Sequence, residues 1–497
     1  MQFSSVESTS TAESFMLIDG DWTPARTDEW IDVESPATRQ PVGRVPRGNV
    51  ADIDRAVQAA ATAFRSWRGE APAVRGLALL RIADDIEADS ERIARLLASE
   101  TGNAIRRQAR PEVASAAALF RYFGGVAGEA KGETVPLGHG LLNYTVREPL
   151  GVVGGIIPWN APVQLASVKI AMALITGNTL VLKAAEDAPL AVLEIARICS
   201  RHLPPGVLNV VTGYGVEAGA ALLAHPGVDK LSFTGSTEVG KIVMRAAADR
   251  ILPVSLELGG KSPVIVFPDA DEDAVAAGVV DGMRFTRQGQ SCTAGSRLLV
   301  HASIFDSFLD RVVEAVSRLR MGDPLDERSD LGTVVNQTQY NRVRSYIDDG
   351  LTCGATPLIG GLPAEAGPGD GLYVPPTVFR GVEPSWRVVR EEIFGPVLVA
   401  IPWHDEAEAL RMANDTHYGL AAYVWSHDIG RALRTAHAID AGWVQVNRGL
   451  GQLPGMSYGG IKQSGLGREF SLEGALDSFT HRKTITVDTH ATPMARG

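Results

Sequence analysis

A single thiol ends a short polar loop, residues 289–292, that lies between a helical pattern and an apolar strand. A cysteine thiolate attacks carbonyl carbons readily, so Cys292 is the first candidate for covalent chemistry. The alternative is an inert cysteine in the core, which is the commoner case for an isolated thiol. Gly289, Gln290 and Ser291 form a polar, tightly turned segment, which is an unfavourable place to bury an idle thiol.

Two more loop residues have side chains that suit carbonyl chemistry. Asn160 follows a Pro-Trp pair, where its amide can stabilise an oxyanion or can simply satisfy a turn. Glu257 ends an apolar run just before two glycines. Partial burial there would raise the pKa of its carboxyl and make it a general base, whereas a glutamate on an exposed strand edge would have no such role.

The composition indicates a globular protein with a small-molecule partner. Of the 497 residues, 45% are hydrophobic and 21% are charged, and the net charge is -11 from 47 Lys and Arg against 58 Asp and Glu. This balance provides no basic patch for nucleic acid and disfavours binding to anionic membrane surfaces. The length predicts two or three domains.

Cysteine usage and the chain ends give further expectations. Three cysteines in so long a chain cannot form a disulfide framework, which indicates a reducing compartment, and we expect a cytoplasmic protein. No Cys-x-x-Cys occurs and no two of the 10 histidines fall within one helical turn, so no metal site is expected. Residues 1–15 carry no basic residue, so they are neither a signal nor a transit peptide and are expected to be a frayed tail. The apolar stretch 151–182 contains Pro158, Pro162 and Lys169, and predicts a strand, a turn and a helix instead of a membrane span.

Strand and helix patterns alternate in two long regions. In the first, strands are predicted at 152–157, 179–183, 208–212 and 230–234, and helices at 164–175, 189–202, 217–225 and 238–247. In the second, strands are predicted at 264–267, 297–301, 397–402, 421–425 and 443–447, and helices at 272–287, 304–319, 339–350, 406–414 and 429–439. Strict alternation indicates parallel sheets covered on both faces, with ligands bound beyond the carboxyl ends of the strands.

Other segments flank these regions. Two apolar stripes, 53–67 and 79–97, each predict one helix, and the Gly/Pro-rich segment 360–371 predicts a loop. Segments 142–147 and 484–487 have strand patterns but no neighbouring strand in the sequence. Exposed strands usually need a partner, so pairing between subunits is predicted. We therefore expect an α/β fold with two open parallel α/β domains and a small β arm.

The loop motifs together resemble those of the aldehyde dehydrogenase superfamily. Its marks are a Glu-Leu-Gly-Gly-Lys segment, here residues 257–261, and a later Gly-Gln-x-Cys loop, here residues 289–292. Further matching segments are 158–160 (Pro-Trp-Asn), 233–236 (Phe-Thr-Gly-Ser), 391–396 (Glu-Glu-Ile-Phe-Gly-Pro), Asn414 with 418–420 (Tyr-Gly-Leu) and 459–465 (Gly-Gly-Ile-Lys-Gln-Ser-Gly). Each motif alone is modest evidence, but their joint order and spacing are highly specific.

The resemblance implies a division into three parts and an assembly. An NAD-binding domain would comprise residues 1–127 and 150–259, and a catalytic domain would comprise residues 260–460. A small β oligomerisation arm would comprise residues 128–149 and 478–497. The assembly implied is a homodimer or a homotetramer.

The resemblance also implies NAD-dependent oxidation of an aldehyde to the carboxylate. Cys292 would attack the aldehyde to give a thiohemiacetal, and hydride transfer to NAD would leave a thioester. Asn160 and the backbone N–H of Cys292 would hold the oxyanion, and Lys169 would be a positioning charge nearby. Glu257 would activate the water that hydrolyses the thioester. Members that pass the acyl group to coenzyme A lack this glutamate, so a carboxylate product is predicted.

The cofactor contacts follow from the same resemblance, since no Gly-x-Gly-x-x-Gly motif occurs. Lys183 and Glu186 would hold the adenosine ribose, although Ala184 replaces the proline of the family motif. A carboxylate at that position would repel a 2′-phosphate, so NAD is favoured over NADP. Ser236 suits a pyrophosphate contact at a helix N-terminus, a role compatible with plain N-capping. The remaining implied contacts are Ile156, Pro158, Trp159, Gly215, Phe233, Gly235, Val239, Leu258, Glu392 and Phe394.

The substrate pocket is predicted to be wide. Ala161 is small where many family members carry a bulky aromatic side chain, and Val168 occupies a site where some have tryptophan. The predicted lining is Ala161, Leu165, Val168, Ser291, Thr293, Leu453 and Tyr458. A bulky, apolar or aromatic aldehyde is therefore expected. Thr286 gives no support to a dicarboxylic semialdehyde, and whether Arg284 or Arg287 faces the pocket stays open.

Two other classes of function compete with this one. A thiol hydrolase would need a histidine near Cys292 as its base, and none stands on these loops. A non-catalytic protein on the same fold would not be expected to keep Cys292, Glu257 and Asn160 together.

Overall fold

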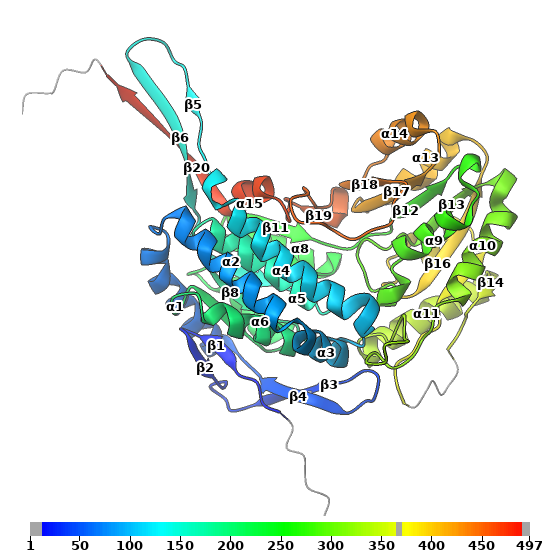
Figure 1. The fold of residues 1–497 in the computed structure, drawn as a ribbon, viewed down its shortest axis with the longest axis horizontal. Helices are drawn as coiled ribbons and strands as arrows, with labels where there is room; N and C mark the ends of the chain where they lie inside the picture. Colours follow the sequence, from blue (N-terminus) through cyan, green and yellow to red (C-terminus); the bar gives the residue numbers. More distant parts are fainter. Residues whose placement is uncertain (1–11, 364–369, 490–497) are drawn as a thin grey trace, which may run out of the picture.

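The computed structural model describes residues 12–363 and 370–489. Two α/β halves lie side by side, and a narrow three-stranded arm projects from the first of them (Figure 1). The predicted α/β class with two open, mostly parallel sheets is confirmed. The predicted domain boundaries stay predictions.

The first half is built on an eight-stranded sheet with the order β19-β11-β10-β7-β8-β9-β1-β2. Its parallel strands are β7 (Val152–Ile156), β8 (Thr179–Lys183), β9 (Leu208–Val211), β10 (Lys230–Thr234) and β11 (Val254–Glu257). Its antiparallel strands are β1 (Met16–Ile18), β2 (Asp21–Thr23) and β19 (Gly465–Leu466). The central strands are short apolar runs because both faces are covered, and Leu180, Val181 and Leu182 are fully buried.

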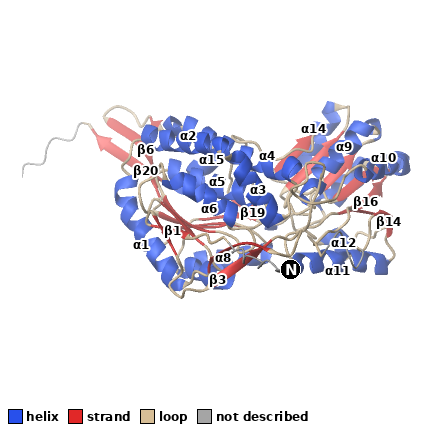
Figure 2. Ribbon diagram, turned by 60° about the horizontal axis from the view of Figure 1, so that its bottom comes forward, coloured by secondary structure: helices blue, strands red, loops and turns tan. Residues whose placement is uncertain are grey.

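Helices cover both faces of this sheet (Figure 2). They are α1 (Val50–Trp67), α2 (Pro72–Ala88), α3 (Ser90–Thr101), α4 (Arg110–Gly125), α5 (Pro162–Ile175), α6 (Leu190–Ser200), α7 (Ala220–Ala224), α8 (Thr237–Ala248) and α15 (Leu472–Phe479). Helices α5, α6 and α8 begin just after the carboxyl ends of β7, β8 and β10. The loops that carry the candidate residues are therefore fixed at both ends.

The second half has a seven-stranded sheet with the order β14-β15-β16-β13-β12-β17-β18. The strands are β12 (Pro263–Val266), β13 (Arg297–His301), β14 (Thr356–Ile359), β15 (Thr377–Arg380), β16 (Val397–Trp403), β17 (Ala421–Trp425) and β18 (Trp443–Val446), and only β14 pairs antiparallel. The helices are α9 (Asp273–Gly282), α10 (Phe305–Ser317), α11 (Gln337–Cys353), α12 (Arg387–Arg390), α13 (Glu406–Asn414) and α14 (Ile429–Ala438). Two apolar cores, one containing Phe379 and the other Phe308, pack against its strands.

The two strand segments without predicted neighbours pair with each other within the chain, and pairing with another subunit stays a prediction. β20 (Thr480–Asp488) runs antiparallel to β6 (Leu141–Pro149), with Thr484 opposite Thr145. β5 (Thr134–Val135) adds a short third strand on the other side of β6. The sequence could not show this pairing because the two strands are separated by most of the chain. The arm projects away from both halves (Figure 1).

Three predictions need correction. The stripe 79–97 forms two helices, α2 and α3, because the chain bends at Asp89. The helix predicted at 272–287 ends at Gly282, and Arg284 and Gln288 have left-handed backbone angles with φ of 61° and 51°. The tail expected at 1–15 is ordered at its end, where Glu13 forms a bridge with Arg44 of β4 (Pro41–Pro46), which pairs with β3 (Trp30–Glu34). Residues 1–11, and residues 364–369 of the predicted loop, lie outside the described residues.

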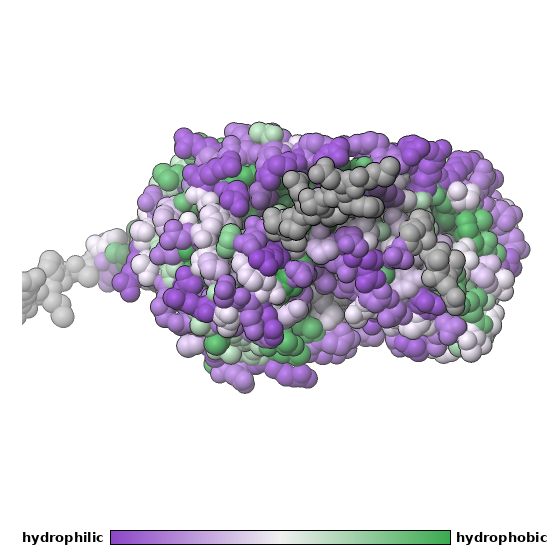
Figure 3. Space-filling view, turned by 90° about the horizontal axis from the view of Figure 1, so that it is seen from below, coloured by the Kyte–Doolittle hydropathy of each residue, from purple (hydrophilic) through white to green (hydrophobic). Residues whose placement is uncertain are grey.

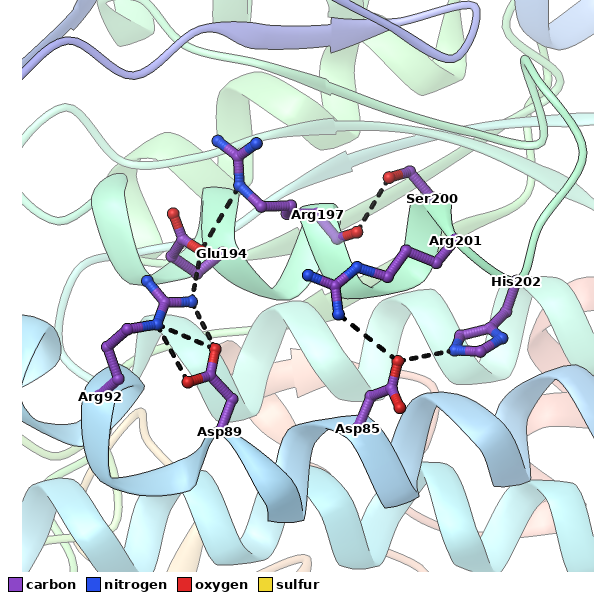
Figure 4. Close-up of polar contacts among 8 residues, drawn as sticks. All are labelled: Asp85, Asp89, Arg92, Glu194, Arg197, Ser200, Arg201 and His202. Atoms are coloured by element: carbon purple, nitrogen blue, oxygen red, sulfur yellow. Dashed lines mark hydrogen bonds and ion pairs between the residues drawn. The ribbon is translucent and has the colours of Figure 1, made fainter.

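Polar contacts near the surface link α2 and α3 to α6 and to the segment that follows it (Figure 4). Arg92 lies 2.5 Å from Asp89 and 2.7 Å from Glu194, and His202 lies 2.9 Å from Asp85. Such exposed pairs contribute about 0–1 kcal/mol each, so the apolar core sets the packing of these helices.

The surface is predominantly polar on the face seen from below, with small apolar groups between charged ones (Figure 3). Among residues 12–363 and 370–489, no helix is both long and apolar enough to cross a membrane.

Candidate active site

A cavity of about 350 Å³ lies between the two halves, and Cys292, Glu257 and Asn160 all line it. Asn160 follows β7, Glu257 ends β11, and Cys292 comes from the second half. The lining residues are Pro158, Trp159, Asn160, Ala161, Gln164, Leu165, Thr234, Gly235, Ser236, Glu238, Glu257, Leu258, Gly259, Arg287, Ser291, Cys292, Gln339, Arg342, Glu392, Phe394, Tyr418, Gln452, Tyr458 and Glu469. The structure thus brings together residues that are far apart in the sequence.

The Cys292 loop is held rigidly. At Gly289 φ is +64°, and a Cβ there would lie 2.1 Å from the carbonyl oxygen of Gly395, so only glycine fits. The backbone carbonyl of Gln290 accepts a hydrogen bond from Asn160 Nδ2 at 3.0 Å. The side chain of Gln290 accepts one from the backbone N–H of Val335 at 3.0 Å. Asn160 is therefore fixed against the same loop that carries the thiol.

Burial raises the pKa of the Cys292 thiol to about 11. The charges of Glu392 and Glu257 act in the same direction, whereas the hydrogen bond with Tyr458 and the charge of Arg287 lower it. The Cys292 Sγ atom lies 3.5 Å from the Tyr458 hydroxyl. The thiol is therefore protonated at neutral pH, and nucleophilic attack requires removal of its proton.

Glu257 is buried, and its surroundings favour the protonated form of its carboxyl. Neither of its carboxyl oxygens has a hydrogen-bond partner in the part of the chain that is described. Burial, and next the charge of Glu469, raise the pKa of Glu257 well above its usual value, while Lys169 and Arg468 oppose the shift. A raised pKa in a cleft is typical of a carboxyl that exchanges protons.

Lys169 lies behind the cavity wall and does not line it. Its ammonium donates hydrogen bonds to Glu469 Oε1 at 2.8 Å and to Ser232 Oγ at 3.0 Å. Glu469, which does line the cavity, was not among the predicted residues. It stands between Arg468 and Phe470 without any motif, so the sequence offered no signal for it.

Most of the implied cofactor residues gather at the carboxyl edge of the first sheet. Those that line the cavity are Pro158, Trp159, Gly235, Ser236, Leu258, Glu392 and Phe394. Ser236 is the N-cap of α8 and accepts a hydrogen bond from the backbone N–H of Val239, which is exposed. Ile156 and Phe233 belong to β7 and β10 and lie outside the cavity.

Contacts within the protein also hold the predicted cofactor residues farthest from one another, which are Lys183 and Glu186 at one end of the site and Glu392 at the other. Lys183, at the end of β8, lies 2.5 Å from Glu186, and Glu186 Oε1 accepts a hydrogen bond from Gly215 N at 3.5 Å. At the other end, Glu392 Oε1 accepts a hydrogen bond from Gly260 N at 3.0 Å, and burial raises the pKa of Glu392 to about 7. The Trp159 and Phe394 rings meet edge to face at 5.4 Å.

The predicted substrate lining is only partly found. Ala161, Leu165, Ser291 and Tyr458 line the cavity. Val168 does not, because α5 runs into the core and Val168 is fully buried there. Thr293 does not either, since its side chain is buried and bonded to Ser291 Oγ at 3.1 Å.

A second cavity of about 550 Å³ adjoins the first and shares Gln164, Ser291, Gln452 and Arg287 with it. Leu453 lines only this outer cavity. The sequence left open whether Arg284 or Arg287 faces the pocket. Arg287 lines both cavities, whereas Arg284 lines only the outer one and donates to the carbonyl of Gly449.

Comparisons with known proteins identify the family to which this chain belongs. The sequence matches the aldehyde dehydrogenase family over residues 22–485. It is 41% identical over 480 residues to a hydroxyisobutyraldehyde dehydrogenase from Mycolicibacterium austroafricanum, which covers 96% of this chain and 94% of that protein. The fold matches an NAD-dependent aldehyde dehydrogenase from Sinorhizobium meliloti with a TM-score of 0.94 at 39% identity, covering 98% and 97% of the two chains. It matches a betaine aldehyde dehydrogenase from Staphylococcus aureus in complex with NAD+ with a TM-score of 0.93 at 36% identity, covering 97% and 96%. The chain therefore belongs to the aldehyde dehydrogenase family and is an oxidoreductase that oxidises aldehydes.

Proposed function

We propose that this protein oxidises a bulky, apolar or aromatic aldehyde to the carboxylate with NAD as cofactor. The observation that carries the proposal is the meeting of a thiol, an amide and an unpaired buried carboxyl, those of Cys292, Asn160 and Glu257, in one cavity. Reduction of NAD on addition of an aldehyde, followed by NADH absorbance, tests it. A thiol hydrolase would release acid from an ester or thioester and leave NAD unreduced.

Cys292 would add to the aldehyde carbon, which places negative charge on the former carbonyl oxygen. One N–H of the Asn160 amide is used by Gln290, so the second N–H is left to donate to that oxygen together with the backbone N–H of Cys292. Glu257 would take a proton from the water that hydrolyses the acyl group, for which a raised pKa is suitable. Lys169 would act through Glu469, to which it is bonded, without touching the substrate.

The residues at the carboxyl edge of the first sheet fit a dinucleotide. When bound, the nicotinamide would supply the acceptor for the hydride, and the acyl group would stay on Cys292 as a thioester. The start of α8, capped by Ser236, offers backbone N–H groups to a pyrophosphate. Lys183 and Glu186 offer a donor and an acceptor to ribose hydroxyls, and Gly215 leaves open space beside them.

Glu186 should decide between NAD and NADP. A carboxylate beside the ribose repels a 2′-phosphate, so we expect Glu186→Gln to reduce the preference for NAD, expressed as a ratio of kcat/KM values, by about tenfold. Parallel initial rates with NAD and NADP measure this ratio. Glu314→Ala, on an exposed face of α10 in the other half, is the matched control and should leave the ratio unchanged. An unchanged ratio of the two kcat/KM values in Glu186→Gln would show that Glu186 does not contact the cofactor ribose.

The size of the substrate can be tested at Ala161. The cavity wall beside Cys292 combines this small side chain with Leu165, Trp159 and Tyr458, which suits a wide apolar group. We expect kcat/KM for benzaldehyde to exceed that for acetaldehyde by about tenfold or more, and Ala161→Phe to reverse most of this difference. Similar values for the two aldehydes in the wild type would contradict the proposed substrate class.

Assembly as a homodimer or homotetramer through the arm is part of the proposal. The arm projects from the body, and Leu141, Leu142 and Val487 on it are exposed. Light scattering of the full chain distinguishes the two states, and a monomer would contradict both.

A further inference from the structure

A buried glutamate on α4 holds the start of the helix that follows Asn160. Glu112 is 2% exposed, and its Oε1 atom accepts hydrogen bonds from the backbone N–H groups of Val163 at 3.1 Å and Gln164 at 3.4 Å. The N-cap residue of α5, Ala161, has no side-chain oxygen to perform this task. Glu112 therefore supplies from another helix the acceptor that the α5 N-terminus lacks.

The other oxygen of Glu112 faces Arg287, which precedes the Cys292 loop. Glu112 Oε2 lies 3.7 Å from Arg287 Nη2. Gln108, one turn earlier on the chain, accepts a hydrogen bond from Arg287 Nε at 2.9 Å when its amide oxygen is turned toward the guanidinium. Glu112 thus connects the segment that carries Asn160 with the loop that carries Cys292.

Arg287 also brings a positive charge into the cavity. Its side chain is only 16% exposed and lines the same cavity as Cys292. The charged side chains that act most strongly on the thiol are Glu257, Glu392 and Arg287, and Arg287 is the one that lowers the pKa of Cys292. Burial opposes ionisation of both members of the Arg287–Glu112 pair, and each offsets this effect on the other.

We propose that Glu112 and Arg287 form a buried positioning pair for the Cys292 nucleophile. Glu112 fixes both the start of α5 and the Arg287 guanidinium. Arg287 then holds the Cys292 loop in register with Asn160 and presents the positive charge that favours the thiolate. Neither residue is assigned a contact with the reacting atoms. The inference rests on the proposed role of Cys292, so its first test uses a reaction that needs neither aldehyde nor NAD, and turnover of the aldehyde is a second readout.

Alkylation of Cys292 by iodoacetamide reports the thiolate directly, because only the thiolate attacks the reagent and displaces iodide. The exposed Cys353 is replaced by serine in every variant, and Cys199 is fully buried. Mass spectrometry of the Cys292 peptide then follows the reaction with time. At pH 8, Arg287→Gln should be alkylated about tenfold more slowly than the parent. An unchanged rate in a folded Arg287→Gln protein would overturn the charge role.

Arg287→Lys separates charge from geometry, since lysine keeps the cation but loses the planar fork that reaches two partners. We expect its alkylation rate to stay within about twofold of the parent and its kcat for aldehyde oxidation to fall at least about fivefold with little change in KM. This variant also carries the test if Arg287→Gln does not fold. A kcat equal to that of the parent would overturn the positioning role.

Glu112→Gln and Glu100→Gln form a matched pair. Glu100 is also fully buried and accepts hydrogen bonds from Leu190 N at 2.7 Å and Ala191 N at 2.9 Å at the start of α6, but no arginine of residues 12–363 and 370–489 pairs with it. We expect slower alkylation, by about threefold, in Glu112→Gln and a parental rate in Glu100→Gln. Equal rates in the two variants would overturn the inference. Absence of NAD reduction by the parent with every aldehyde would instead contradict the proposed function and leave the alkylation result valid.

Discussion

Cys292→Ala is expected to lower the turnover number for aldehyde oxidation by about 10⁴-fold or more, to the level of background. Among the side chains described in the cavity lining, the Cys292 thiol is intrinsically the strongest nucleophile toward a carbonyl carbon. In the proposed mechanism Asn160 would stabilise the oxyanion and Glu257 would activate water toward the thioester, and both species form only after addition of the thiol. Steady-state NADH formation under saturating aldehyde and NAD measures the effect.

Cys353→Ser is the matched control for this experiment. Cys353 is exposed at the end of α11, and its replacement should leave turnover within about twofold of the parent. The alanine variant should also keep its melting temperature, because a small side chain is lost beside an existing cavity. Retention of a tenth or more of the parental turnover in Cys292→Ala would rule out this cysteine as the nucleophile.

Glu257→Gln should separate the two halves of the reaction. The amide keeps the shape of the carboxyl but cannot accept a proton from water, so hydrolysis of the acyl group should fall by about 10²–10⁴-fold. In the proposed scheme Glu257 acts on water only after attack by Cys292 and loss of the hydride, so we expect the variant to retain these earlier steps. A rapid-mixing experiment should therefore show a burst of about one NADH per site followed by a near-complete stall.

The pH dependence gives an independent test of the same residue. Burial, and next the charge of Glu469, raise the pKa of Glu257, so the fraction of the carboxyl in its base form increases at a higher pH than for an ordinary glutamate. The hydrolytic step of the parent should thus accelerate with increasing pH, and that of Glu257→Gln should not show this acceleration. Normal steady turnover in the variant, with a parental pH profile, would exclude Glu257 as the base.

Much of the fold could be predicted because its strands are short and buried on both faces. Runs such as 179–183 carry apolar side chains at every position, and they alternate with helices long enough to show a clear period. The residues at which helices end were harder to predict. The apolar stripe runs through 79–97 without interruption, and Asp89 and Ser90, which suit a helix start, are the only local mark of the break between α2 and α3 within that stretch. After α9, Arg284 and Gln288 adopt left-handed backbone angles, which residues other than glycine rarely adopt.

The candidate site also contains some features that the sequence predicts and others that depend on the tertiary structure. The sequence by itself determined the motif loops, since glycines and turn residues such as Gly289 are dictated by backbone geometry. It also placed Ser236 correctly at the start of a helix. Only the tertiary structure decided which side chains reach the cavity: it excluded Val168, brought in Glu469, and joined Glu112 to Arg287. The physical reason is that local patterns fix the path of the backbone, whereas burial, pKa and contact depend on segments that are distant in the chain and meet only when the two halves pack together.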